Sequence, residues 1–194
     1  PNVATEIGLA AYIGDTTGNR PAPDLAESGV VKLLELYGRY EDGPWVARGS
    51  WIAGSLDNSG AITAANKQLS NDLGVARTPV GGGASALGVE VGYDLLFSEH
   101  DDEATPEDDV SEPIDTVPEL GRRLDLFVRY DRYDSLAEVA EGVADNPRFD
   151  RETWTLGFNY FLNPKVLLKL DQSWRSLGSD QDENTLSFGM GYEF

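Results

Sequence analysis

Residues 186–194, Leu-Ser-Phe-Gly-Met-Gly-Tyr-Glu-Phe, alternate strictly between large apolar side chains and small or polar ones. Successive side chains of a β-strand point to opposite faces, so this period of two predicts a strand with one wholly apolar face. The residues of that face are Leu186, Phe188, Met190, Tyr192 and Phe194. A strand of this kind needs an apolar environment on one side only, which constrains the chain to a sheet with two chemically different faces.

Seven earlier segments alternate in the same way, and turn-forming or polar connections separate them. The expected strands are residues 6–14, 31–41, 45–56, 84–96, 123–131, 154–160, 165–175 and 186–194. The sequence therefore predicts one all-β domain over residues 1–194, with eight antiparallel strands joined in order. Strands of about nine to twelve residues have the length that a tilted strand needs to cross a bilayer.

The composition is compatible with a membrane β-barrel and argues against several other classes of protein. The chain is 40% hydrophobic with a mean hydropathy of -0.35, and it has no apolar run long enough for a spanning helix. It contains no cysteine, which excludes disulfides and thiolate ligands. Its net charge of -19 argues against a nucleic-acid partner, because phosphate binding needs a basic surface.

The acidic charge is concentrated in residues 98–121, which contain many Asp and Glu residues and no Lys or Arg. This segment predicts a solvated, disordered insertion. A calcium site is the alternative, but the segment lacks the Asp-x-Asp-x-Asp-Gly spacing of a calcium loop. We expect no metal and no cofactor.

The connections predict the sidedness of the strands. Short turns at Asp42-Gly43 and Asn163-Pro164 fall at one end, and long polar loops at 15–29, 57–83, 134–150 and 176–183 fall at the other. Short inner turns and long outer loops are typical of outer-membrane barrels. The acidic segment is the exception, because it lies on the side of the short turns.

The polar faces of the strands carry charges of both signs. We expect these side chains to line a lumen: Glu35, Tyr37, Arg39, Arg48, Glu90, Asp94, Arg123, Asp125, Arg129, Asp131, Lys165, Lys169, Asp171 and Arg175. One interpretation is a charged pore wall that tunes which solutes pass, and the other is a salt-bridge network that fills the interior. Aromatic residues near the strand ends resemble the two girdles of membrane barrels.

An enzyme is not expected. His100 is the only histidine and lies within the acidic segment, so a Ser-His-Asp arrangement on the barrel wall would have no base.

Several motifs resemble the C-terminal half of Gram-negative outer-membrane porins, in the broad family related to the phosphate-selective porins. They are Leu-Phe-Val-Arg-Tyr-Asp-Arg-Tyr-Asp at 126–134, Trp-Thr-Leu-Gly-Phe-Asn-Tyr at 154–160, Asn-Pro-Lys-Val-Leu-Leu-Lys-Leu-Asp at 163–171 and the closing Phe-Gly-Met-Gly-Tyr-Glu-Phe. The resemblance is good from about residue 124 onward and looser before it. It implies a transmembrane barrel of about sixteen strands, of which eight are present here.

The resemblance also implies a function and partners. These are passive diffusion of small hydrophilic solutes or ions across the bacterial outer membrane, contact with lipid and lipopolysaccharide, N-terminal strands of the same barrel that are missing here, and a homo-trimer. It implies that Phe188, Met190, Tyr192 and Phe194 form the signal read by the barrel-assembly machinery. It does not transfer phosphate selectivity, because the expected lumen face is mixed in sign beneath acidic loops, which favours cations.

Two other functions remain open at this point. One is a closed eight-stranded barrel that serves as an anchor or adhesion scaffold, for which the first and last strands would pair directly. The other is a barrel that sheathes a partner protein.

Overall fold

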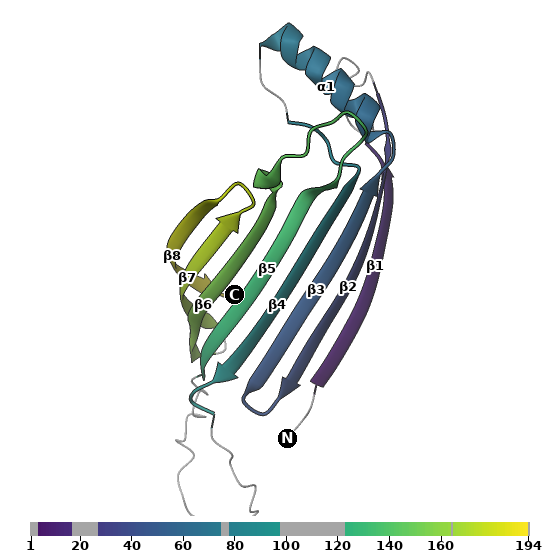
Figure 1. Ribbon diagram of the computed structural model, residues 1–194. Coiled ribbons are helices and arrows are strands. Elements are labelled where there is room, and N and C mark those ends of the chain that lie inside the picture. The colour runs from purple at the N-terminus through teal and green to yellow at the C-terminus, as the bar shows by residue number, and fades with distance from the viewer. Residues whose placement is uncertain (1–3, 17–26, 75–77, 98–122, 164, 194) are drawn as a thin grey trace, which may run out of the picture.

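The computed structural model describes residues 4–16, 27–74, 78–97, 123–163 and 165–193 of the 194-residue chain. The fold is one sheet of eight antiparallel strands in the order β1 to β8 (Figure 1). Their bounds are β1 Ala4–Asp15, β2 Val30–Asp42, β3 Trp45–Leu56, β4 Gly83–Asp94, β5 Arg123–Glu138, β6 Asp150–Asn163, β7 Val166–Leu177 and β8 Gln181–Tyr192. The predicted strand order and antiparallel pairing are confirmed. The expected disorder of the acidic segment concerns residues outside those described.

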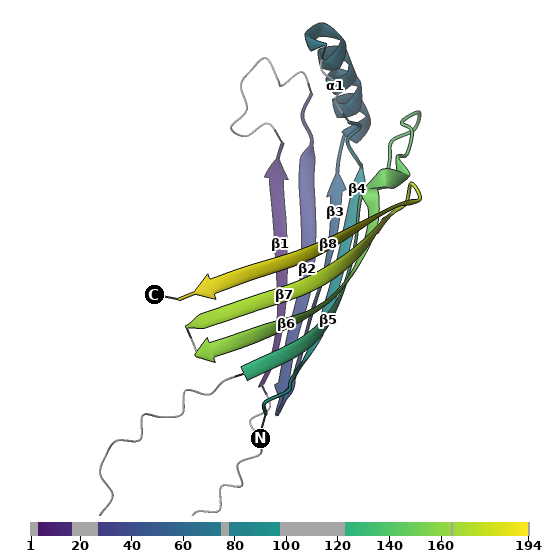
Figure 2. The same cartoon turned by 90° about the vertical axis from the view of Figure 1, so that its left-hand side faces the viewer.

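The sheet is open and strongly curved. Each strand pairs with its sequence neighbours, and β1 and β8 are not paired with each other. In Figure 2 the first strands stand nearly upright, whereas β6, β7 and β8 cross them obliquely. This change of direction is the right-handed twist of strands accumulated across the sheet.

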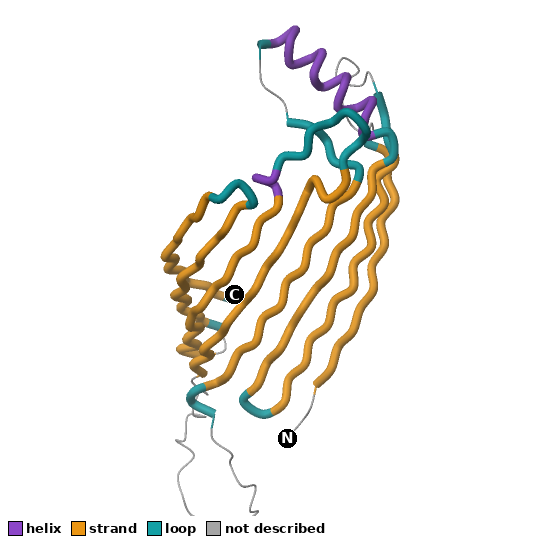
Figure 3. Tube along the Cα trace, in the orientation of Figure 1, coloured by secondary structure: helices purple, strands orange, loops and turns teal. Residues whose placement is uncertain are grey.

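The connections separate by length only in part. The predicted long loop at 176–183 is wrong, because β7 continues to Leu177 and β8 begins at Gln181, so a short turn joins the two strands. Figure 3 shows the helices and the long connections at one end of the strands, together with the short β7–β8 turn, and the tight β2–β3 turn at the other end. Gly43 supplies the positive φ of 53° that this tight turn requires.

The predicted extended loop at 57–83 is wrong in one respect, because it contains helix α1, Ser59–Leu73. Apolar residues recur at Ile62, Ala65 and Leu69 with helical spacing, and Gly74 ends the helix in the left-handed conformation. The Thr63 hydroxyl accepts a hydrogen bond from Val80 N at 3.0 Å and donates one to Val80 O at 3.3 Å. These contacts join the helix to the segment that leads into β4.

Two other differences lie at the same end. β5 continues past the expected end at Asp131 to Glu138, and a 3-10 turn, η2 Pro147–Phe149, precedes β6. In this extension Arg132 and Asp134 occupy positions of the otherwise apolar face, so the alternation that predicts the strand breaks off there. The strand continues because its backbone pairs with β4 and β6, with Arg132 opposite Glu152 and Asp134 opposite Asp150.

The described residues form almost no apolar core. The only buried hydrophobic side chains among them are Ile62, Phe127, Leu136 and Leu177. Many large apolar side chains are exposed instead, including Ile7 at 76% and Phe188 at 75%. No helix within the described residues is long and apolar enough to cross a membrane.

Candidate functional site

The strand register divides the sheet into two faces of opposite character. One hydrogen-bonded row contains Glu6, Arg39, Arg48, Glu90 and Arg129, and belongs to the polar face. The row displaced by one residue on the opposite face is apolar and contains Ile7, Val89, Tyr130 and Trp154 together with Gly38 and Gly49. We call these the polar wall and the apolar face.

Twelve of the expected lumen residues lie on strands with the side-chain parity of the polar wall. They are Glu35, Tyr37, Arg39, Arg48, Glu90, Arg123, Asp125, Arg129, Asp131, Lys169, Asp171 and Arg175. Two others lie at strand ends. The Asp94 carboxylate accepts hydrogen bonds from the backbone N of Leu96 and Leu124 at 3.0 and 3.1 Å, and Lys165 lies in the turn before β7.

Ion pairs run along the polar wall. Four join residues two positions apart on one strand, where side chains share a face. They are Arg39–Glu41, Arg123–Asp125 at 2.6 Å, Arg129–Asp131 at 2.7 Å and Lys169–Asp171 at 3.5 Å. Two more, Arg48–Glu90 at 2.7 Å and Arg175–Glu183 at 3.2 Å, join residues directly opposite on neighbouring strands.

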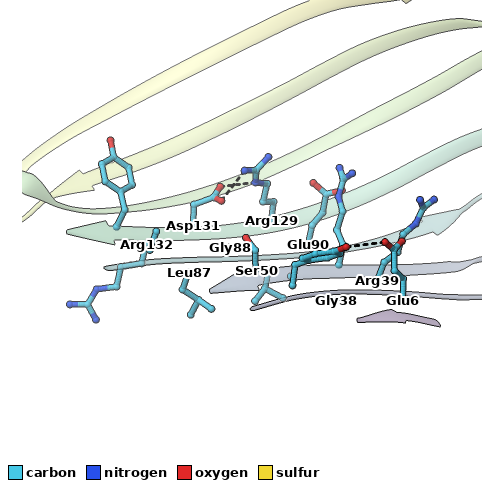
Figure 4. Close-up of a pocket in the computed structure, with 16 residues that line it drawn as sticks. Glu6, Gly38, Arg39, Ser50, Leu87, Gly88, Glu90, Arg129, Asp131 and Arg132 are labelled. Carbon is cyan, nitrogen blue, oxygen red and sulfur yellow. Dashed lines mark hydrogen bonds and ion pairs between the residues drawn. The ribbon is translucent and has the colours of Figure 1, made fainter. Parts of the chain in front are cut away.

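A hollow of about 550 Å³ lies at the centre of the polar wall (Figure 4). Its charged and polar lining includes Tyr37, Arg39, Arg48, Glu90, Arg129 and Asp131. Figure 4 shows Arg129, Asp131 and Glu90 on one side of the sheet and Leu87 and Arg132 directed to the other. The hollow therefore presents guanidinium, carboxylate and phenol groups to whatever occupies the space in front of the wall.

Two aromatic rings on this wall lie over glycines of neighbouring strands. Tyr37 covers Gly8, and its hydroxyl donates to Glu6 Oε1 at 3.2 Å. Phe127, which is 2% exposed, covers Gly157 on the neighbouring strand, and Lys169 Nζ lies 5.1 Å from the centre of its ring. A ring that covers a strand glycine shields the backbone on which it lies.

Sequence reasoning missed several residues of the polar wall. Glu6, Phe127 and Gly157 belong to it, and so do Tyr133 and Arg151, whose Nη1 donates to the Tyr133 hydroxyl at 2.8 Å. Parity along each strand would have placed Glu6 and Phe127. The Tyr133–Arg151 pair needed the longer β5, because an expected end at residue 131 leaves out Tyr133.

Arg132 lies on the apolar face, at the border toward the long connections. It contacts Asp150 at 3.2 Å and Glu152 at 3.6 Å. Residues 129–134 read Arg-Tyr-Asp-Arg-Tyr-Asp, which is a three-residue repeat. The side chains of a strand alternate between its faces with a period of two residues, so corresponding residues of the two copies of the repeat face opposite sides. Arg129 and Asp131 consequently face the polar wall, and Arg132 and Asp134 face the other side.

Aromatic side chains border the apolar face in two rows. Toward the short-turn end are Tyr40, Trp45, Tyr93, Tyr160 and Tyr192, and toward the other end are Trp51, Tyr130, Trp154 and Trp174. Contacts within each row join neighbouring strands, with ring centres 4.7 Å apart for Trp45 and Tyr93 and 4.8 Å for Tyr130 and Trp154. All four tryptophans of the chain lie on this face.

The expected assembly residues continue the apolar face into β8. Phe188, Met190 and Tyr192 are 75%, 72% and 59% exposed. Phe194 lies outside the described residues.

The apolar belt shifts steadily from strand to strand. The belt in β8 begins at Leu186, and the hydrogen-bonded row through Leu186 reaches β1 at Thr5. In β1 the corresponding end of the belt is Ile13, eight residues farther along the strand than Thr5. With about 3.3 Å per residue and 4.8 Å between strands, this displacement over seven strand pairs corresponds to a tilt of about 40°.

The chemistry of the site is that of a charged surface. Among the described residues, no three His, Asp or Glu side chains gather as metal ligands. Comparison with known proteins supplies no relative: no family model matches the chain, and no curated protein or solved structure matches it.

Proposed function

We propose that this chain forms part of a transmembrane β-barrel of the outer-membrane porin type, and that the barrel allows small hydrophilic solutes or ions to diffuse passively through its lumen. In this proposal the apolar face contacts lipid and the polar wall lines the lumen. The end of the sheet that carries α1 and the β7–β8 turn lies outside the cell, and the tight β2–β3 turn lies in the periplasm.

The stagger of the apolar belt is the observation that carries the proposal. A belt that shifts by about one residue per strand becomes level when the strands tilt by about 40°, and strands of β-barrels tilt by about 35–45°. A level apolar belt between two aromatic rows is what a bilayer requires of a spanning sheet. The exposure of Ile7, Leu9, Phe188 and Met190, each above 70%, supports the same conclusion, because water would disfavour such a surface.

The open edges favour a barrel larger than eight strands. Strand edges carry unpaired backbone groups that the hydrocarbon of a bilayer cannot satisfy, so β1 and β8 each require a second neighbour there. A closed eight-stranded anchor would pair β1 with β8, and the described sheet does not. Further strands of this protein or of another copy would complete the barrel and leave a wider lumen.

The decisive experiment is electrical. The full-length protein, purified in detergent and added to a planar lipid bilayer, is expected to produce stepwise increases in conductance of uniform size. A boiled sample, in which the barrel is unfolded, is the control. Protein that inserts into the bilayer without conducting would contradict the diffusion function and favour the anchor. Protein that stays in the aqueous phase would contradict the membrane barrel itself.

A further inference from the structure

The ion pairs of the polar wall are unequally exposed. The Arg48 side chain is 59% exposed and its partner Glu90 only 12%; Lys169 is 42% exposed and Asp171 13%. The pair Arg123–Asp125 has the same order, at 39% and 12%. In these three pairs the carboxylate lies deeper in the wall than the cation, and Arg39–Glu41 at 55% and 32% and Arg129–Asp131 at 47% and 27% have the same order. Arg175–Glu183, at the end of the wall toward the β7–β8 turn, is the exception, because its carboxylate is the more exposed at 52% against 41%.

Small residues on neighbouring strands permit this arrangement. A Cβ at Gly88 would lie 3.1 Å from the Asp131 carboxylate, and one at Gly157 would lie 2.7 Å from Asp171 Cβ. The short acidic side chains therefore lie close to glycine backbone. The longer Arg and Lys side chains reach past them with their charged ends, as long basic side chains do when their stems lie on a surface.

Arginines are concentrated in the central row of the wall. Arg39 and Arg48 are directly opposite each other on β2 and β3, and Arg129 lies in the same row on β5. Like charges directly opposite on neighbouring strands are destabilising. The row also contains Glu6 and Glu90, so its arginines outnumber its carboxylates by one, and the opposition of Arg39 to Arg48 is retained at a cost in stability.

We propose that the lumen wall presents a cationic surface to solutes and that the pore passes anions in preference to cations, with Arg39, Arg48 and Arg129 as residues that determine this selectivity. This inference rests on the proposed function. At Arg39–Glu41, Arg48–Glu90 and Arg129–Asp131 a solute in the lumen meets the guanidinium group first, because it is the more exposed partner. Charges beyond about 8–10 Å are largely screened at physiological salt, so the groups that a solute passes within this distance have the largest effect on it.

The expectation is opposite to the one from charge counting, in which a mixed wall beneath acidic loops favours cations. A count of charged residues gives every side chain the same weight, whereas the exposed fractions show that the basic side chains of most pairs lie nearer the open space than the acidic ones. The sign of one measured quantity, the reversal potential, distinguishes the two expectations.

The test is the reversal potential of the full-length protein in a planar bilayer separating two KCl concentrations. The expected sign is that of a chloride-selective pore. The double variant Arg48→Gln, Arg129→Gln is expected to lower the chloride-to-potassium permeability ratio by about threefold, because two exposed charges leave the wall. Arg48→Lys with Arg129→Lys retains both charges and is expected to keep the ratio close to that of the wild type.

Arg132→Gln is the matched control. Arg132 is on the same strand as Arg129 but points to the opposite face (Figure 4), so its loss is expected to leave the ratio unchanged. A potassium-selective wild type, or a conducting Gln double variant with the wild-type ratio, would overturn the inference and leave the diffusion function standing. A wild type that does not conduct would overturn both.

Discussion

Phe127 on β5 lies directly opposite Gly157 on β6, and its ring occupies the space that a side chain at position 157 would need. This packing contact joins β5 to β6 on the polar wall, where the other side chains are mostly charged. Phe127 is the most deeply buried of the few hydrophobic residues buried in the described part of the chain.

Gly157→Ala is expected to destabilise the protein. A Cβ there would lie 2.6 Å from Phe127 Cζ, so the ring has to move, and overpacking of this kind costs about 1–3 kcal/mol. The measurement is the free energy of unfolding by guanidinium chloride in detergent or lipid vesicles. Gly189→Ala on β8 is the matched control, because a Cβ at that position meets no atom within 4 Å. Equal stability of the two variants would contradict the packing described.

Tryptophan fluorescence is expected to report on the apolar face alone. Trp45, Trp51, Trp154 and Trp174 all lie on that face and are 43–54% exposed. Vesicles of brominated phospholipid should quench the emission strongly, and aqueous iodide should quench it weakly. The reverse order of quenching would place this face in water and contradict the proposed membrane orientation.

A charge on the apolar face is expected to cost more than the same charge on the polar wall. Phe188→Arg places a guanidinium toward lipid, which costs about 2–4 kcal/mol near the bilayer midplane. Ser187→Arg is the control, because Ser187 lies opposite Asp171 on the polar wall. The free energy of unfolding from lipid vesicles measures both. If the two variants were equally stable, or if Ser187→Arg were the less stable, the assignment of the faces would be wrong.

Thr63→Val is expected to loosen helix α1 without affecting the sheet. The substitution removes both hydrogen bonds between the Thr63 hydroxyl and the backbone of Val80, each worth about 1 kcal/mol. Hydrogen–deuterium exchange should accelerate in residues 59–73 and 78–82 and stay unchanged in β6 and β7. Thr63→Ser keeps the hydroxyl and should exchange as the wild type does. Acceleration throughout the sheet would show that α1 contributes to the stability of the whole fold.

The sequence predicted the strands where polarity alternates and failed where it does not. The terminal strand from Leu186 onward and the segment from Arg123 to Asp131 alternate clearly, and both are strands. Beyond Asp131 the charged residues Arg132 and Asp134 occupy positions of the apolar face, so only the pairing with β4 and β6 reveals the rest of β5. Helix α1 was hidden by its polar composition, although Ile62, Ala65 and Leu69 have helical spacing.

The sequence predicts which residues belong to the candidate site, but it does not predict which of them contact each other. Parity along a strand places Arg129 and Asp131 on one face, and their spacing of two already makes them neighbours. The opposition of Arg48 to Glu90, and that of Phe127 to Gly157, depends on the register between strands. The depth of each carboxylate depends on which residue lies beside it on the next strand, and alternation contains no information about it.

The Arg-Tyr-Asp-Arg-Tyr-Asp repeat at 129–134 has a consequence for how the sheet finds its register. A slip of one residue normally exchanges the two faces of a strand and exposes the error. Here the slip would replace Arg129, Asp131 and Tyr133 by Tyr130, Arg132 and Asp134, which carry the same three kinds of side chain. The side chains of residues 129–134 therefore do not specify the register of β5. The register depends on the first half of the strand, where polar and apolar residues alternate from Arg123 to Leu126 and Phe127 fits against Gly157.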